Sequence, residues 1–512
     1  MERRSFLGWF AAVPLLVPGA TAVMGETPAE KDRSRTILMV DDSGILYRSG
    51  TKRILRPLDR HPGNPLLPGR DKPWEVAVAW NSVYRDPDTG LYQLWYQAYS
   101  GAQAHDPSHA CVACYAESQD GIHWTKPDLG LFSYNGIEKT NIVLVGNAGH
   151  SVRYGASVVV DPRDEDLSRR YKMAYFDFSR DEGREYPGLS VAFSPDGKRW
   201  TKHSKAPLLR AAYGNRGADV PYADETDKAW LAPLSISDAT DVMYDPKRGV
   251  FAIYGKMWID GPDGQMFWKH ALQRTESRDF VHWTRPELVL TPDELDPEYV
   301  EFHTAPVFLY NDTYFALLQI LNRAERGGIM DIELAVSRDG LRWDRPFRRP
   351  FFLARNPEGG FDGGSIFNNP NLILHGDEMR FYYGGYSEGA TGANDYELTT
   401  GIGLATMPRD RFASVRPVHD VGQITLKPAL LGGGRSATLN ADASGGSIRV
   451  EVLDDMGRRV RGFAKSDAQP ISGDSLAHPV QWGARSFRDL PEGQYMLRLH
   501  LAGADVFGVN LQ

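Results

Sequence analysis

The feature that most constrains this chain is a seven-residue turn motif with the pattern Ser-x-Asp-Gly-x-x-Trp. Asp-Gly is typical of the tight turn of a β-hairpin, and the Ser and Asp side chains can bond the backbone of the same turn. The Trp is then expected to pack back onto the sheet. The four copies are Ser118–Trp124, Ser194–Trp200, Ser277–Trp283, with Phe in place of Gly, and Ser337–Trp343. A repeat with so long a period predicts a propeller or another array rather than one packed core.

A second repeat precedes the first: an apolar strand, a turn and an aromatic strand. Its five copies are Val83–Pro87 with Tyr92–Tyr96, Val158–Pro162 with Tyr171–Tyr175, Val242–Pro246 with Val250–Tyr254, Val307–Tyr310 with Tyr314–Leu318, and Ile366–Pro370 with Met379–Tyr383. The turn after the fifth copy, Met407–Phe412, is degenerate. Each unit therefore predicts four antiparallel strands, and such units repeated radially are propeller blades. The sequence predicts an all-β fold with a five-bladed β-propeller over residues 36–415. Stacked sandwiches that share hairpin chemistry are the alternative.

The N-terminal residues 1–22 have the pattern of an export signal. Arg3-Arg4-Ser5-Phe6-Leu7 precedes an apolar run from Gly8 to Val17, and Ala20-Thr21-Ala22 fits a small-x-small cleavage site. The arginine pair resembles the twin-arginine signal, while an ordinary secretory signal or an uncleaved anchor is the alternative. The apolar run is too short for a stable transmembrane helix. We expect an exported protein, periplasmic or extracellular, with no membrane contact beyond export.

Two further segments lie outside the repeats. The strand Ile37–Val40 could close the propeller ring or lie across its face. Residues 416–512 hold short alternating runs with Gly-rich turns, as in Ile448–Leu453 and Tyr495–Leu501, which predict a small β-sandwich. This accessory domain could bind carbohydrate, but Trp482 is its only Trp, so a structural cap is favoured.

Charge and cysteine content exclude several functions. The 512 residues carry a net charge of −8 without a basic run, which argues against nucleic-acid binding. The only cysteines, Cys111 and Cys114, have C-x-x-C spacing, but zinc would need a second pair. Because they fall on a predicted strand, we expect buried, reduced thiols.

Residues near the beginning of each inner strand are expected to surround the propeller axis. They are Glu75, Trp80 and Asn81 in blade 1, Arg153 and Tyr154 in blade 2, Asp238 and Asp241 in blade 3, Glu301 and His303 in blade 4, and Asp362 in blade 5. Acids that converge on one axis cannot all ionise easily, so some of their pKa values must rise. Carboxyl groups with separated pKa values are what glycosidic bond cleavage requires. Asp86, Asp161 and Asp245, by contrast, stand in Asp-Pro turns at the other end of their strands and are assigned to turn chemistry.

With its export signal, its repeated turns and five predicted blades, the chain resembles the five-bladed propeller glycoside hydrolases of families 32 and 43 and their uncharacterised relatives. The resemblance covers about three quarters of the chain. It implies a base or nucleophile on blade 1, an aspartate that tunes the acid, and a glutamate general acid. By their position in the blades, the resemblance assigns the base or nucleophile to Glu75, the tuning aspartate to Asp238 or Asp241, and the general acid to Glu301. The Trp-x-Asn-Asp-Pro-Asn-Gly signature of the fructan-cleaving members is absent.

The sequence thus predicts an exported glycoside hydrolase that acts on a polysaccharide or oligosaccharide. Glu301 would protonate the leaving oxygen, and Glu75 or Asp241 would activate water or attack the sugar carbon. Trp80 and Tyr154 would stack on the sugar, and Asn81, Arg153, His303 and Asp362 complete the predicted substrate site. Two alternatives stay open: a non-catalytic carbohydrate-binding propeller, and a glycan phosphorylase that uses Arg153 and His303 to bind phosphate. No cofactor and no metal ligands are predicted, although a calcium ion on the channel axis is left open, and no oligomeric state is predicted.

Overall fold

The computed structural model describes residues 35–147, 154–181, 184–211, 236–265, 268–325, 327–389 and 397–512. Across these ranges the fold is all-β, as predicted, with single-turn 3-10 helices at Gly101–Gln103, Pro107–His109, Leu167–Arg169 and Phe487–Asp489. No helix in this part of the chain is long and apolar enough to cross a membrane. The predicted export signal, residues 1–22, and Arg153 lie outside the described residues.

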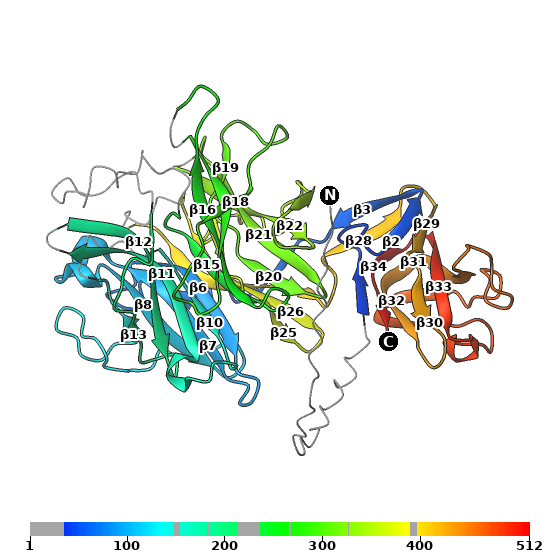
Figure 1. Ribbon diagram of the computed structural model, residues 1–512, viewed down its shortest axis with the longest axis horizontal. Coiled ribbons are helices and arrows are strands. Elements are labelled where there is room, and N and C mark those ends of the chain that lie inside the picture. The colour runs from blue at the N-terminus through cyan, green and yellow to red at the C-terminus, as the bar shows by residue number, and fades with distance from the viewer. Residues whose placement is uncertain are drawn as a thin grey trace, which may run out of the picture.

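Three separate antiparallel sheets form the first three units of the larger half of the molecule (Figure 1). Unit 1 contains β6 (Ala77–Arg85), β7 (Tyr92–Tyr99), β8 (Cys111–Ser118) and β9 (Ile142–Leu144). Unit 2 contains β10 (Tyr154–Val160), β11 (Tyr171–Asp181), β12 (Arg184–Ser194), β13 (Thr201–Lys202) and β14 (Leu209–Arg210). Unit 3 contains β15 (Thr240–Asp245), β16 (Val250–Ile259), β17 (Lys269–Ser277) and β18 (Glu287–Leu290). In each, the first four strands pair in chain order, which is the order predicted for a propeller blade, and in unit 2 the short strand β14 pairs with β12 beside β13.

Units 4 and 5 repeat this order and are joined by one parallel pairing, Met330 with Ser365. Unit 4 contains β19 (Val300–Phe302), β20 (Val307–Tyr310), β21 (Thr313–Asn322), β22 (Ile329–Ser337) and β23 (Asp344–Phe347). Unit 5 contains β24 (Ser365–Asn368), β25 (Ile373–His375), β26 (Glu378–Tyr386) and β27 (Thr400–Pro408). Its outer strands, β4 (Asp59–Arg60) and β5 (Leu67–Pro68), come from the N-terminal side of the propeller and pair with β27. The ring is therefore closed by residues 59–68 and not by Ile37–Val40.

Apolar side chains pack each unit against the next, and the last against the first. Five buried clusters lie between neighbouring units in this way. Aromatic contacts at the five seams are Trp95–Tyr171, Phe193–Phe280, Tyr254–Trp343, Phe308–Phe381 and Trp124–Tyr382. Because the seams run from unit 1 to unit 5 and back to unit 1, we take the units as blades 1 to 5 of one propeller.

The repeated turns have the predicted chemistry. In the first, Ser118 Oγ accepts a hydrogen bond from Gly121 N at 2.9 Å, and Asp120 Oδ1 accepts from the backbone N–H groups of residues 122 and 123, each at 2.8 Å. Gly121 has φ of +75°, which Gly adopts without strain. Its carbonyl oxygen accepts a hydrogen bond from the Tyr382 hydroxyl of blade 5 at 2.8 Å. The carbonyl oxygens of Gly197 and Gly340 accept in the same way from Trp95 and Tyr254 of the preceding blade, so each of these three turns also joins two blades.

Other structural predictions are also confirmed. Asp86, Asp161 and Asp245 accept hydrogen bonds from backbone N–H groups of their own turns. Cys111 and Cys114 lie on β8, are buried, and are not joined in a disulfide.

The C-terminal half is one ten-stranded sheet folded into a sandwich, and it includes three N-terminal strands (Figure 1). Its members are β1 (Arg35–Leu38), β2 (Ile45–Ser49), β3 (Thr51–Leu55), β28 (Ala413–Pro417), β29 (Val421–Leu426), β30 (Ala429–Leu431), β31 (Ala437–Asp454), β32 (Ile471–Pro479), β33 (Gly493–Ala502) and β34 (Asp505–Leu511). The long strand β31 pairs with β34 through its first part and with β33 through its second.

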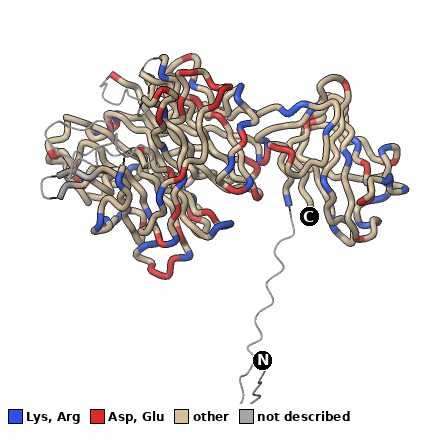
Figure 2. Tube along the Cα trace, turned by 45° about the horizontal axis from the view of Figure 1, so that its top comes forward, with Lys and Arg blue, Asp and Glu red and all other residues tan. Residues whose placement is uncertain are grey.

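The strand pairing corrects the predicted division at residue 36. Residues 35–55 pair with β28, β29 and β34 rather than with any blade, because these sandwich strands offer edges to strands from the other end of the chain. From residue 35 the chain thus first runs through the sandwich, then passes once around the propeller and returns to the sandwich. Figure 2 shows that both charge signs are spread over the two halves.

Candidate active site

Five polar residues, four of them buried and Asp238 partly buried, gather at the seam between blades 3 and 4, at the end where the inner strands begin. Asp238 precedes β15, Lys256 is on β16, His270 on β17, Glu301 on β19, and His303 directly follows β19. We call these five residues the seam cluster. Because four of the five side chains are buried, each charged group is held by a partner within the cluster or beside it.

Asp238 forms the first half of the cluster. Its carboxylate makes an ion pair with Lys256, and the Lys256 ammonium lies 3.5 Å from His303 Nε2. His303 Nδ1 is 3.0 Å from Gln319 Oε1, which fixes the proton on Nδ1 and leaves Nε2 as an acceptor. Burial opposes ionisation of Asp238, but Lys256 and the two histidines outweigh it and lower the pKa of that carboxyl. Burial and Lys256 lower the pKa of His303 to about 3, so this imidazole is neutral.

Glu301 forms the second half of the cluster. It accepts a hydrogen bond from the His270 backbone N–H at 2.6 Å, and His270 Nδ1 lies 2.8 Å from the same oxygen. Arg323, at the end of β21, pairs with the other carboxylate oxygen. Burial opposes ionisation here too, but His270 and Arg323 lower the pKa of Glu301 to about 2. The His270 ring packs against Trp258 with 3.7 Å between centroids and the ring planes tilted by 40°, and burial lowers the pKa of His270 to about 4.

Asp241 lies beside the cluster and behaves differently. Its Oδ2 accepts a hydrogen bond from the Thr304 hydroxyl of blade 4 at 2.8 Å. No cation offsets burial at this position, so the pKa of Asp241 rises to about 7. Ser82 and Ser157 hold the corresponding place at the two preceding seams, where their hydroxyl oxygens accept from Val158 N and Val242 N. The position that holds a serine at those two seams therefore holds a titratable acid at the seam between blades 3 and 4.

Aromatic side chains connect the cluster to the propeller axis. The Trp80 ring of blade 1 lies 6.0 Å from the His303 ring and 4.4 Å from Phe367 of blade 5. His303 is therefore in contact with inner strands of two other blades. Two exposed aromatic side chains lie close to the cluster in the chain: Trp268 comes two residues before His270, and Tyr299 two residues before Glu301.

The structure does not bring every predicted residue to this seam. Glu75 is fully buried in blade 1, where Tyr96 donates to it at 2.6 Å and Lys126 pairs with it at 2.6 Å; burial raises its pKa. Asn81 accepts a hydrogen bond from Asn369 at 2.8 Å.

Asp362 accepts from Arg60 at 2.8 Å and from Tyr383 at 2.9 Å, which ties blade 5 to its closing strand. Tyr154 pairs through its backbone with Phe176, and its side chain, like Arg153, lies outside the described residues.

Sequence reasoning missed three partners of these acids. Lys256 and His270 lie on the second and third strands of blade 3, and Arg323 directly follows the second strand of blade 4, whereas the predicted site residues stand near the beginning of first strands. Lys256 does carry a signal, because it interrupts the apolar run of β16. Among the described residues, no group of three or more His, Cys, Asp or Glu side chains is placed to hold a metal ion.

Comparisons with known proteins add a likeness in fold. No family model matches the chain, and no curated protein matches it. Several solved structures do match the chain in fold. An N-acetylgalactosamine deacetylase from F. plautii is 17% identical with a TM-score of 0.45, over 69% of this chain and 96% of that one. A glycoside hydrolase structure from Parabacteroides distasonis is 14% identical with a TM-score of 0.43, over 69% and 97%. A thermostable family-43 glycoside hydrolase is 16% identical with a TM-score of 0.39, over 64% and 88%. At this level we take nothing about activity from them.

Proposed function

We propose that this chain is an exported glycoside hydrolase that cleaves an O-glycosidic bond in a polysaccharide or oligosaccharide. The observation that carries the proposal is the separation of carboxyl pKa values at one seam: burial raises the pKa of Asp241 to about 7, whereas Lys256 outweighs burial and lowers the pKa of Asp238. Cleavage of a glycosidic bond needs one carboxyl that gives a proton and one carboxylate that activates water or attacks the sugar.

Asp241 is the proton donor in this proposal. A donor works best when its pKa is near the working pH, and the pKa of Asp241 meets that condition. Sequence analysis assigned this role to Glu301, whose pKa of about 2 leaves it without a proton at neutral pH. We assign Glu301 instead to positioning, since it anchors His270 through the backbone N–H and lies beside the ring Nδ1.

Asp238 is the base or nucleophile. Lys256 keeps it ionised, and 13% of its side chain is exposed compared with 3% for Glu301. Trp268 and Tyr299 offer exposed rings at the same end of the blades for stacking on a sugar. The export part of the proposal rests on the sequence of residues 1–22.

The test is a hydrolysis screen against neutral and acidic polysaccharides and oligosaccharides, with released reducing ends as the readout. The chain without residues 1–22 is compared with Asp238→Asn, Asp241→Asn and Glu301→Gln. Asp312→Asn is the matched control, because Asp312 is 80% exposed and pairs only at the surface with Lys247. We expect release by the parent and the control, and loss of release in the first two variants.

Other outcomes would change the assignment. Loss in Glu301→Gln alone would return the donor role to Glu301. Release that depends on phosphate would indicate a phosphorylase. Binding of one glycan by every variant, with no release by any, would indicate a carbohydrate-binding propeller.

A further inference from the structure

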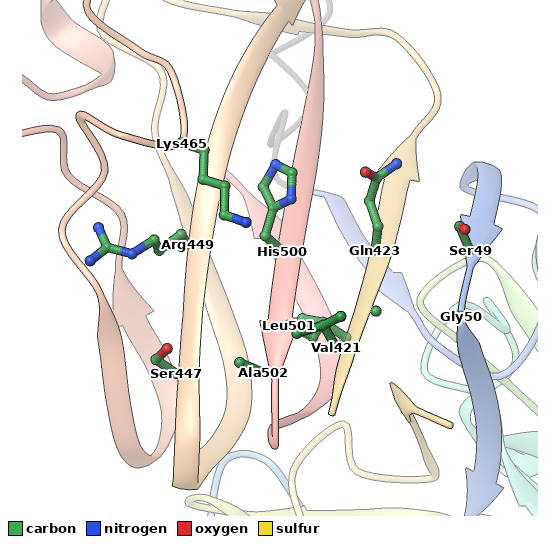
Figure 3. A pocket seen from close by; sticks show the side chains of 11 residues that line it. Ser49, Gly50, Val421, Gln423, Ser447, Arg449, Lys465, His500, Leu501 and Ala502 are labelled. Carbon is green, nitrogen blue, oxygen red and sulfur yellow. The ribbon is translucent and has the colours of Figure 1, made fainter. Parts of the chain in front are cut away.

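A second polar site lies on the outer face of the C-terminal sandwich (Figure 3). A cavity of about 580 Å³ is lined there by side chains of β2, β29, β33 and β31 and by Lys465. The site is in the other half of the molecule from the seam cluster (Figure 1), and no role assigned above uses it.

Strand register places four polar side chains in one row across this face. Ser49 pairs with Gln423, Gln423 with His500, and His500 with Arg449. Their chain neighbours Ile424, Leu499 and Val450 are buried in the core of the sandwich. Because successive side chains of a strand point to opposite faces, the polar row faces outward, as Figure 3 shows.

The cavity carries positive charge that is not neutralised. Within residues 397–512 and the other described ranges, neither Arg449 nor Lys465 forms an ion pair, and Arg449 is anchored by donating one N–H to the carbonyl oxygen of Ala468. The nearby acid, Glu451, is 2% exposed and is already shared among Arg459, Arg498 and His500. Burial and the charge of Lys465 lower the pKa of His500, against the opposing effect of Glu451. Two cations and a row of hydrogen-bonding groups therefore surround the cavity.

An aromatic ring borders the row. Tyr47 lies two residues before Ser49 on the same face of β2 and is 43% exposed. Its hydroxyl accepts hydrogen bonds from Arg498 at 2.6 Å and from Gln423 at 3.3 Å, which hold the ring in place. A fixed, exposed ring beside amide, hydroxyl and cationic groups suits a sugar that carries an anionic group.

We propose that this face of the sandwich binds an acidic polysaccharide through Arg449 and Lys465, with Gln423, His500 and Tyr47 contacting the sugar. The anionic group is a uronic acid carboxylate or a sulfate ester, which share the chemistry that the two cations recognise. The site tethers the chain to an acidic polymer and needs no reaction at the seam cluster. A carbohydrate ligand agrees with the proposed function, while the preference for an anionic ligand is inferred from the residues of the cavity alone.

The test is affinity electrophoresis of the full chain in gels that contain polygalacturonate, dextran sulfate or neutral dextran. The parent is compared with the double variant Arg449→Gln/Lys465→Gln. The matched control is Lys427→Gln/Arg458→Gln, which removes two exposed positive charges from the same domain outside the cavity. Loss of a charge-assisted hydrogen bond weakens binding about tenfold or more. We therefore expect the double variant to bind an acidic polymer at least about tenfold more weakly than the parent, and the control to bind like the parent.

Retardation by polygalacturonate alone assigns a carboxylate ligand, and retardation by dextran sulfate alone assigns a sulfate ester. Equal retardation of parent and double variant, equal binding to neutral dextran, or binding to DNA with no polysaccharide binding would each overturn the proposal. Lys465→Glu serves as a second variant, because Lys465 is exposed and its replacement disturbs no packing; circular dichroism checks the fold of each. Asp238→Asn should keep full binding, so a failure of the proposed hydrolysis is distinguishable from a failure of this site.

Discussion

The two ends of the propeller use the same residue types for different purposes. At the end with the repeated turns, aspartates are kept ionised by groups of their own turn: Asp120 by the His123 side chain and backbone N–H groups, and Asp339 by backbone N–H groups. At the other end, Asp238 and Glu301 are kept ionised by side chains from other strands. The turn aspartates thus depend on local sequence alone, whereas the seam cluster depends on neighbouring strands being in register. The difference indicates that one end stabilises the blades and the other is available for chemistry.

The largest expected effect is on turnover at the seam cluster. Asp238→Asn removes the proposed base or nucleophile, and we expect kcat to fall by about 10²–10⁴-fold with little change in the far-UV circular dichroism spectrum. At the turn end, Asp339→Asn should leave kcat within about twofold of the parent. Equal losses in the two variants would remove the functional distinction between the ends.

The next effect is on stability. Lys256→Met leaves the Asp238 carboxylate buried without its cation, which should cost about 3 kcal/mol of unfolding free energy. The matched change, Lys247→Met, breaks the surface pair with Asp312 and should cost less than about 1 kcal/mol. Urea denaturation measures both. A cost for Lys256→Met no larger than that for Lys247→Met would show that the cluster is solvated.

A third prediction compares two glycines that both have positive φ. Gly340 has φ of +73°, and a Cβ there would lie 2.6 Å from Arg274 Nη1 and 2.8 Å from the Tyr254 hydroxyl of the preceding blade. Gly249 has φ of +67° with nothing within 4 Å. Gly249→Ala should therefore cost only the strain of the left-handed backbone, about 1–2 kcal/mol. Gly340→Ala should cost more, because it also disturbs the contact between blades 3 and 4. Equal losses of Tm would mean that this contact contributes little.

The smallest effect is a pH dependence set by Asp241. Its pKa is raised from 3.8 to about 7, so the folded chain binds more protons than the unfolded chain between these values. Stability from this group is therefore fully present below about pH 4 and is lost as the pH rises toward 7. Asp241→Ser, which installs the residue used at the two preceding seams, should flatten that part of the stability profile. Thermal denaturation from pH 4 to 8 measures it; a profile as steep as that of the parent would assign the titration to another group.

Much of the propeller was predictable from the sequence. The turn at Ser337–Trp343 is specified within seven residues, because its hydrogen bonds join Ser337 and Asp339 to the backbone two or three positions ahead. Strands such as β7 and β16 were likewise evident from their apolar and aromatic composition.

The candidate site was only partly predictable. Asp238, Asp241, Glu301 and His303 were found because they stand near the beginning of inner strands. Their partners Lys256 and Arg323 were not, because each meets its acid across 18 or 22 positions of the chain, at distances that depend on strand register. Glu75 was placed in the site by analogy of position, yet its neighbours Tyr96 and Lys126 hold it within blade 1.

The sequence by itself determined the local chemistry of this protein: the turns, the strand pattern, the repeat and the all-β fold. Only the tertiary structure decided which acids are ionised, which strands close the ring, and that residues 35–55 join the C-terminal sandwich. The physical reason is how far apart in the chain the interacting groups lie. A turn is stabilised by contacts a few residues apart, whereas a carboxyl pKa and the pairing of an edge strand depend on groups that folding brings together from distant parts of the chain.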